Sequence, residues 1–97
     1  MLKDIVEVTP LENYHLRIRF EDGIYGEVDV SQLVKFTGVF APLTEKVFFQ
    51  RVRLDPELGS ICWENGADLD TDVLYALISG EPLPSFESLL YVTFSNG

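Results

Sequence analysis

The fold is decided by residues 14–30, which read YHLRIRFEDGIYGEVDV. The first part alternates apolar and polar side chains, which is typical of a strand with one buried and one solvated face. A three-residue loop over 21–23 pairs Phe20 with Ile24 and keeps both apolar sets on the same face. Gly23 supplies the positive φ that such a loop requires. The stretch therefore predicts an antiparallel hairpin with a defined register.

The same register places basic side chains opposite acidic ones on the solvated face of the hairpin. Arg17 faces Glu27, and His15 faces Asp29. Because the charges are matched across the strands, these basic residues do not form a free phosphate-binding patch. No nucleophile lies beside His15, so we interpret it as an outward-facing strand residue and not as a catalytic one.

Short elements are predicted on either side of this hairpin. We expect strands over 5–9, 49–54 and 60–64, and a turn over 55–59. Single helical turns are expected over 31–35 and 44–48, the second capped by Thr44, with an apolar connector over 39–43 between them. A helix is expected over 72–79, and its apolar stripe is formed by Val73, Leu74, Leu77 and Ile78. Asn65-Gly66 is expected to lead the last strand directly into that helix. Trp63 is expected in the core between the second hairpin and the helix. The fold class predicted is α+β, a small antiparallel sheet built from hairpins with short helices and one C-terminal amphipathic helix.

Length and composition indicate one domain in a reducing compartment. The 97 residues are 46% hydrophobic and 24% charged, as in soluble globular domains. We expect residues 1–84 to form a single α+β domain and residues 85–97 an apolar C-terminal extension. One cysteine, Cys62, excludes an intrachain disulfide, and a single histidine beside it excludes a Cys/His zinc site. Without a long apolar run or a signal-peptide pattern, a cytoplasmic location is expected, with no membrane partner.

Charge is divided unevenly along the chain. Residues 1–53 carry eight acids and seven bases, whereas residues 54–97 carry eight acids and no Lys or Arg. A net charge of −9 disfavours direct nucleic acid binding, because that affinity comes from Lys and Arg. The acidic half fits a basic protein partner, whose approach it would accelerate. The alternative is that these acids serve solubility alone.

Asp68, Asp70 and Asp72 are the residues with the chemistry of metal ligands, because alternating carboxylates can bind Ca²⁺ or Mg²⁺. A calcium loop counted from Asp68 would need Gly and Glu at the positions of Val73 and Ser79. Acids at a helix N-terminus also accept backbone N–H groups and face the positive end of the helix dipole. Helix capping therefore explains the three aspartates without a metal. With no catalytic constellation found, we expect a protein that is not an enzyme.

Residues 61–69 read ICWENGADL and are preceded by Leu54-Asp55-Pro56 and followed by Leu74-Tyr75. With this pattern, residues 1–84 resemble a family of small bacterial domains of unknown function, DUF family 2442. The resemblance implies a small α+β fold, no established enzymatic activity and no cofactor. The residues that match its signature are our candidates for an interaction site, with a folding role as the alternative: Trp63, Asn65, Gly66, Ala67 and Asp68.

The resemblance also implies a biological setting. Some relatives carry a helix-turn-helix after this module, and others are encoded beside a second small protein, as in toxin–antitoxin or regulatory pairs. Only residues 85–97 follow Pro84, too few for a helix-turn-helix, so we expect no direct DNA binding. Our hypothesis is an acidic protein-interaction module, the regulatory or antitoxin-like half of a two-protein bacterial system. The alternative is a divalent-metal-dependent hydrolase or metal-sensing domain that uses Asp68, Asp70 and Asp72.

Residues 89–94 read LLYVTF, a β-prone apolar run that must be covered by other apolar surface. We expect it to be an association element. It would pair with a sheet edge of its own chain, or link two chains into a homodimer through residues 85–97. The side chains concerned are Leu89, Leu90, Tyr91, Val92 and Phe94.

Overall fold

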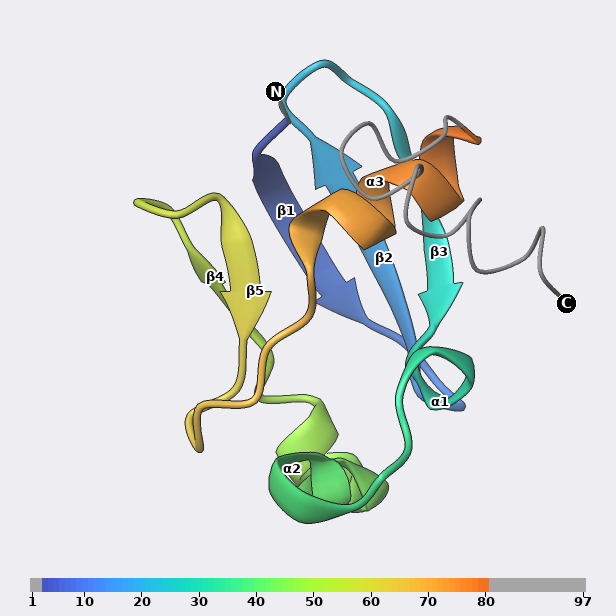
Figure 1. Ribbon diagram of the computed structural model, residues 1–97, viewed down its shortest axis with the longest axis vertical. Coiled ribbons are helices and arrows are strands. Elements are labelled where there is room, and N and C mark those ends of the chain that lie inside the picture. The colour runs from blue at the N-terminus through green and yellow to red at the C-terminus, as the bar shows by residue number, and fades with distance from the viewer. Residues whose placement is uncertain (1–2, 81–97) are drawn as a thin grey trace, which may run out of the picture.

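The computed structural model describes residues 3–80, and these form two small antiparallel sheets with short helices (Figure 1). In chain order the elements are β1 (Ile5–Pro10), β2 (His15–Phe20), β3 (Tyr25–Asp29), α1 (Val30–Leu33), the 3-10 helix η1 (Gly38–Thr44), α2 (Lys46–Phe49), β4 (Arg53–Asp55), β5 (Ser60–Cys62) and α3 (Thr71–Ser79). One sheet has the order β1-β2-β3, and the other pairs β4 with β5. The predicted α+β class is confirmed.

The β2–β3 hairpin has the predicted register. The Phe20 N–H donates to the Ile24 carbonyl at 2.8 Å, and the pairs continue regularly along both strands. Gly23 has a φ of 91°, as the three-residue loop requires. On the solvated face, Arg17 and Glu27 form an ion pair at 3.1 Å. Alternation of side chains and one glycine are therefore sufficient to predict this hairpin.

Strand β1 joins the two sheets. It pairs antiparallel with β2 and contains an irregularity between Ile5 and Glu7. The Ile5 N–H donates to the Gly59 carbonyl at 2.8 Å, which links β1 to the turn between β4 and β5. Gly59 has a φ of 65°, and a Cβ there would collide with the side chain of Asp4. Glycine is thus required at the point where the sheets meet.

The core lies between the three-stranded sheet, α3 and the second sheet, and α3 crosses one face of β2 and β3 (Figure 1). Gly26 of β3 allows the close approach of α3, since a Cβ at this position would lie 2.8 Å from Cγ2 of Ile78. The buried apolar residues form one cluster: Ile5, Leu16, Ile18, Phe20, Val28, Val30, Leu43, Phe49, Ile61, Trp63, Ala67, Leu69 and Leu74.

Two capping residues delimit α3. Asp70 is the N-cap, and its Oδ1 accepts the N–H groups of Asp72 at 2.8 Å and Val73 at 3.3 Å. At the other end, Gly80 has a φ of 81° and donates its N–H to the Ala76 carbonyl at 2.9 Å. Both caps satisfy backbone groups that a helix end leaves without partners.

The segment 39–55 differs most from the prediction. The expected apolar connector over 39–43 is part of η1, and the expected cap Thr44 is replaced by Glu45, which makes no side-chain capping bond. The expected strand over 49–54 was wrong for its first four residues. Phe49 closes α2 by donating its N–H to Glu45 O at 2.9 Å, and the strand begins only at Arg53. Burial of the Phe49 ring outweighs its local β-propensity.

The predicted apolar stripe of α3 is also only partly correct. Leu74 is buried and Ile78 packs over β3, but Leu77 is 54% exposed. Tyr75 replaces it in the contact with the sheet, where its ring meets Phe20 edge-on with the ring centroids 4.9 Å apart.

Tyr75 also carries a polar contact between α3 and the β2–β3 loop. Its hydroxyl donates to Oδ2 of Asp22 at 2.6 Å. This hydrogen bond is the main reason that the pKa of Asp22 lies below its ordinary value of 3.8, with a further contribution from the Ile24 N–H. A carboxyl whose pKa is lower in the folded protein stabilises the fold above its unfolded pKa, and the effect is lost as the pH falls through the folded pKa.

We therefore expect Tyr75→Phe to reduce the acid sensitivity of the protein. The melting temperature should fall less between pH 7 and about pH 3 in this variant than in the parent, because the Asp22 contribution is already missing at neutral pH. Tyr25→Phe is the control, since Tyr25 is an exposed residue of β3. Equal melting shifts for parent and Tyr75→Phe over this pH range would contradict the assigned role.

Candidate functional site

The residues that match the family signature form a tight turn between β5 and α3, here called the signature loop (residues 63–68). Trp63 donates its N–H to the Ala67 carbonyl at 2.8 Å, and Gly66 donates to the Trp63 carbonyl at 3.0 Å. Cys62 and Asp68 then face each other as an antiparallel bridge. The expectation that Asn65-Gly66 leads directly into a helix was wrong. The chain reverses first, because Gly66 adopts a φ of 92°, and α3 begins only at Thr71.

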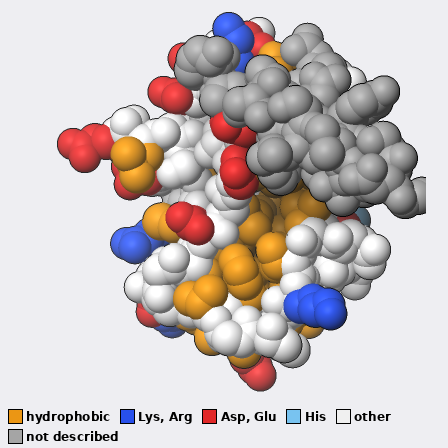
Figure 2. Space-filling view, viewed as in Figure 1, with side chains coloured by type: hydrophobic (Ala, Val, Ile, Leu, Met, Phe, Trp, Pro, Cys, Tyr) orange, Lys and Arg blue, Asp and Glu red, His pale blue; other side chains and the backbone are white. Residues whose placement is uncertain are grey.

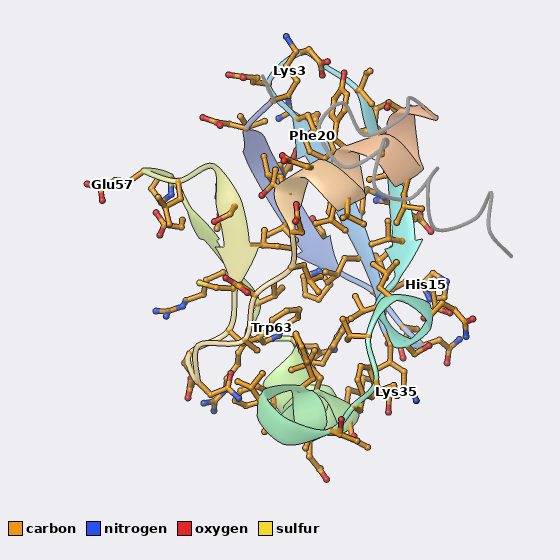
Figure 3. All side chains as sticks on the ribbon, viewed as in Figure 1. Lys3, His15, Phe20, Lys35, Glu57 and Trp63 are labelled. Carbon is orange, nitrogen blue, oxygen red and sulfur yellow. The ribbon has the colours of Figure 1, made fainter. Side chains whose placement is uncertain are left out.

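Trp63 occupies the centre of this arrangement. Its side chain is 1% exposed, and Nε1 donates to the Phe49 carbonyl at 2.9 Å. The centroids of the Trp63 and Phe49 rings lie 5.9 Å apart, and the ring planes are inclined by 40°. The indole therefore packs against Phe49 at the end of α2 (Figure 3), and the expectation that Trp63 lies in the core is confirmed. A buried indole needs an acceptor, and carbonyls in the last turn of a helix lack the usual intrahelical partner.

Asn65 attaches the signature loop to η1. Its Nδ2 donates to the Val39 carbonyl at 2.9 Å, and its Oδ1 accepts the Ala67 N–H at 3.1 Å. Ala67 itself is 1% exposed, so a small side chain is required where the loop enters the core. Trp63, Asn65 and Ala67 thus hold the loop in place by burial and hydrogen bonds.

The outward side of the loop is acidic. Glu64, Asp68 and Asp70 are exposed, and only Glu64 has an ion pair in the described chain, with Arg51 at 3.4 Å. Partial burial raises the pKa of Asp72, and the nearby charge of Asp70 raises it further. Apart from the pair of Glu64 with Arg51, the negative charges on this side have no ion-pair partner in residues 3–80. The name acidic surface is used below for Glu64, Asp68, Asp70 and Asp72.

The aspartates of this surface do not form a metal site. Within residues 3–80, no three or more His, Cys, Asp or Glu side chains are grouped so that they could hold a metal ion, and Asp68, Asp70 and Asp72 all lie in that range. The Oδ1 of Asp70 is occupied by two backbone N–H groups at the start of α3. Helix capping is thus the observed role of Asp70.

Cys62 and His15 have side chains that could take part in catalysis, but neither lies in a catalytic arrangement in the described chain. Cys62 is a free, half-buried thiol in β5. Nδ1 of His15 lies 2.9 Å from the carbonyl oxygen of Asn13, and His15 pairs with Asp29 across the hairpin as predicted. Neither residue is part of a nucleophile–base pair among the hydrogen bonds of residues 3–80.

The sequence analysis did not identify an apolar groove between α1 and α3. It is lined by Leu33, Val34, Leu69, Asp70, Val73 and Leu74. The sequence signal that could have revealed it is the width of the apolar stripe on α3, which exceeds what the sheet covers. The predicted association residues Leu89, Leu90, Tyr91, Val92 and Phe94 lie outside the described residues, so their role stays a prediction.

These features define a small α+β domain whose characteristic residues build a structural turn beneath an acidic surface. The chain belongs to the family described as Protein of unknown function (DUF2442), whose family model matches residues 5–80. The resemblance inferred from the signature is thereby confirmed. No curated protein and no solved structure matches the chain. In the described part of the chain, none of the helices has the length and apolar character needed to cross a membrane.

Trp63 is expected to be a residue of the fold. Trp63→Ala should lower the free energy of unfolding by about 3–5 kcal/mol, because it removes a buried aromatic side chain and leaves a cavity. Trp63→Phe should cost less, since it keeps a ring but leaves the Phe49 carbonyl without the indole donor. Urea unfolding of the three proteins tests this order. A Trp63→Ala protein as stable as the parent would assign Trp63 to recognition.

Gly66 offers a test of the turn itself. A Cβ at this position would have no atom within 4 Å, so a substitution changes the backbone preference alone. Gly66→Ala should destabilise the protein by about 1–2 kcal/mol, because its φ lies in the left-handed region. Gly66→Asn should cost less, since Asn tolerates that region. Equal unfolding midpoints for Gly66→Ala and the parent would contradict this account.

Proposed function

We propose that this protein is a small acidic protein-interaction module and that its partner is a basic protein. The observation that carries the proposal is a difference between two surfaces. Charged side chains of the three-stranded sheet form ion pairs within the described part of the chain, whereas most carboxylates of the acidic surface do not. Opposite charge raises the rate at which two proteins meet and selects among partners, so an uncompensated surface is the natural place for such a partner.

Charges of the three-stranded sheet are compensated within the chain. Arg19 and Glu7 pair at 2.9 Å across β1 and β2, and Arg17 and Glu27 pair at 3.1 Å across β2 and β3. These pairs lie on the solvated face, where each contributes little to stability but cancels the local field. A charged partner would gain little from this face.

The acidic surface differs in this respect. Residues 54–80 contain six acids and no Lys or Arg. Of the four ion pairs found in the described chain, only the one between Arg51 and Glu64 reaches this segment. Figure 2 shows acidic side chains scattered over the left half of this view. The elevated pKa of Asp72 is the electrostatic consequence of burial and of its neighbour Asp70.

We further propose a setting for this interaction. The module would act as the regulatory or antitoxin-like half of a two-protein bacterial system in the cytoplasm, with the basic protein as the other half. This part of the proposal rests on the gene arrangements that the family resemblance implies. It needs no cofactor and no enzymatic step, and no direct contact with nucleic acid.

Co-purification from the native host, followed by binding measurements with the recovered protein, tests the proposal. Asp68→Lys should weaken binding by roughly tenfold or more, and binding of the parent should weaken as salt rises. Glu27→Lys is the matched control, because it makes the same change of charge at an exposed acid of the compensated face. Both variants should melt close to the parent, since both side chains are exposed.

Three outcomes contradict the proposal. The first is co-purification of no protein, and the second is an affinity that does not change between low and high salt. The third is a loss of binding in Glu27→Lys that equals the loss in Asp68→Lys. That last result would show that total charge, and not the acidic surface, governs association.

A further inference from the structure

An apolar groove separates α1 from α3. Its volume is about 170 Å³, and the side chains that line it come from the end of α1, the segment before α3 and the first turn of α3. Hydrophobic side chains are exposed across the centre of the face in Figure 2, in the region between these two helices. Asp70 is the one charged residue of the lining, and its carboxylate is engaged with backbone N–H groups of α3.

The apolar face of α3 is wider than its contact with the sheet. Ile78 covers Gly26 of β3, and Leu74 is buried. Val73 lines the groove, and Leu77 follows it by one helical turn on the same side, with 54% of its surface exposed. Apolar side chains one turn apart make a continuous stripe. Within residues 3–80, the Leu77 end of this stripe is therefore only partly covered.

We propose that the C-terminal run of this same chain, residues 89–94, occupies the groove within one molecule. The run supplies five apolar side chains in six residues, and Lys and Arg are absent from residues 54–97 altogether. An apolar run placed on this groove removes apolar surface from water on both sides. The one charge of the lining, on Asp70, keeps its two backbone N–H partners. The groove shares only Asp70 with the acidic surface, and the argument for its occupant does not rest on the proposed function.

The connection is long enough. The described chain ends at Gly80, whose left-handed conformation ends α3. From there, the groove lies back along the helix near Val73, about 10 Å away at 1.5 Å per residue. Residues 81–88 are eight residues that can extend over about 26 Å. Pro82 and Pro84 prevent the helix from continuing and favour an extended path.

A short tether favours the same molecule over a second copy. A covalent link of this length gives the attached run an effective concentration in the millimolar range at the groove. A run from another chain, at micromolar protein concentration, would have to bind roughly a thousandfold more favourably to compete. The groove is therefore filled from within, and a homodimer through residues 85–97 is the competing arrangement.

Hydrogen exchange and light scattering on the full chain test this assignment. The chain should be a monomer, and the amides of residues 89–94 should exchange at least about tenfold more slowly than in the isolated peptide 85–97. Leu77→Lys should abolish most of this protection, because it places a charge on the apolar stripe. Leu58→Lys is the control, since Leu58 is 72% exposed on the turn between β4 and β5.

A truncated chain gives an independent readout. A protein ending at Pro84 should remain monomeric and bind the added peptide 85–97 in calorimetry, whereas the full chain should not bind it. Exchange of residues 89–94 at the peptide rate would overturn the proposal. A dimer that becomes monomeric on truncation would also overturn it, in favour of exchange between two chains. Equal protection in Leu77→Lys and Leu58→Lys would show that the run is covered elsewhere.

Discussion

The hydrogen bond from the Trp63 indole to the Phe49 carbonyl connects parts of the chain that no regular sheet joins. Trp63 follows β5 and Phe49 ends α2, so this contact docks the η1–α2 segment against the second sheet. It also sets where the signature loop begins. Because Asn65 then reaches the Val39 carbonyl in η1, the loop is held at two points, and α3 starts in a defined place over the three-stranded sheet.

The β2–β3 hairpin could be predicted in detail because its determinants are local. Alternating side chains specify which face of the strand is buried, and Gly23 selects the loop length that keeps Phe20 and Ile24 paired. The caps of α3 follow from the same kind of reasoning, since Asp70 and Gly80 act on backbone groups a few residues away. In each case the hydrogen bonds and backbone preferences that determine the conformation involve residues close together in the sequence.

The predictions from sequence were wrong where contacts between distant segments determine the local conformation. Asn65-Gly66 is ambiguous by itself, and the contact of Asn65 with Val39, 26 residues away, favours the reversal over a direct entry into the helix. Phe49 has the β-propensity of a strand residue, yet burial beside Trp63 makes it the end of a helix. The residue type indicates that Trp63 is buried, because large aromatic side chains are usually found in the core. It does not indicate which residues contact Trp63, because those contacts depend on how distant segments of the chain pack together.

The signature loop contains two kinds of residue, those that hold the turn in place and those that are exposed on its outer side. The side chains of Trp63, Asn65 and Ala67 are constrained by folding, because they must be buried or hydrogen bonded for the chain to reverse. Trp63 and Ala67 are also buried away from any partner, whereas Asn65 is exposed. Their neighbours Glu64 and Asp68 point outward and are free of that constraint. A turn held by burial and hydrogen bonds is a suitable platform for recognition, since ordering costs are met by the fold before a partner arrives. The buried side chains of the signature therefore supply the shape of the turn, and its exposed carboxylates supply the charge.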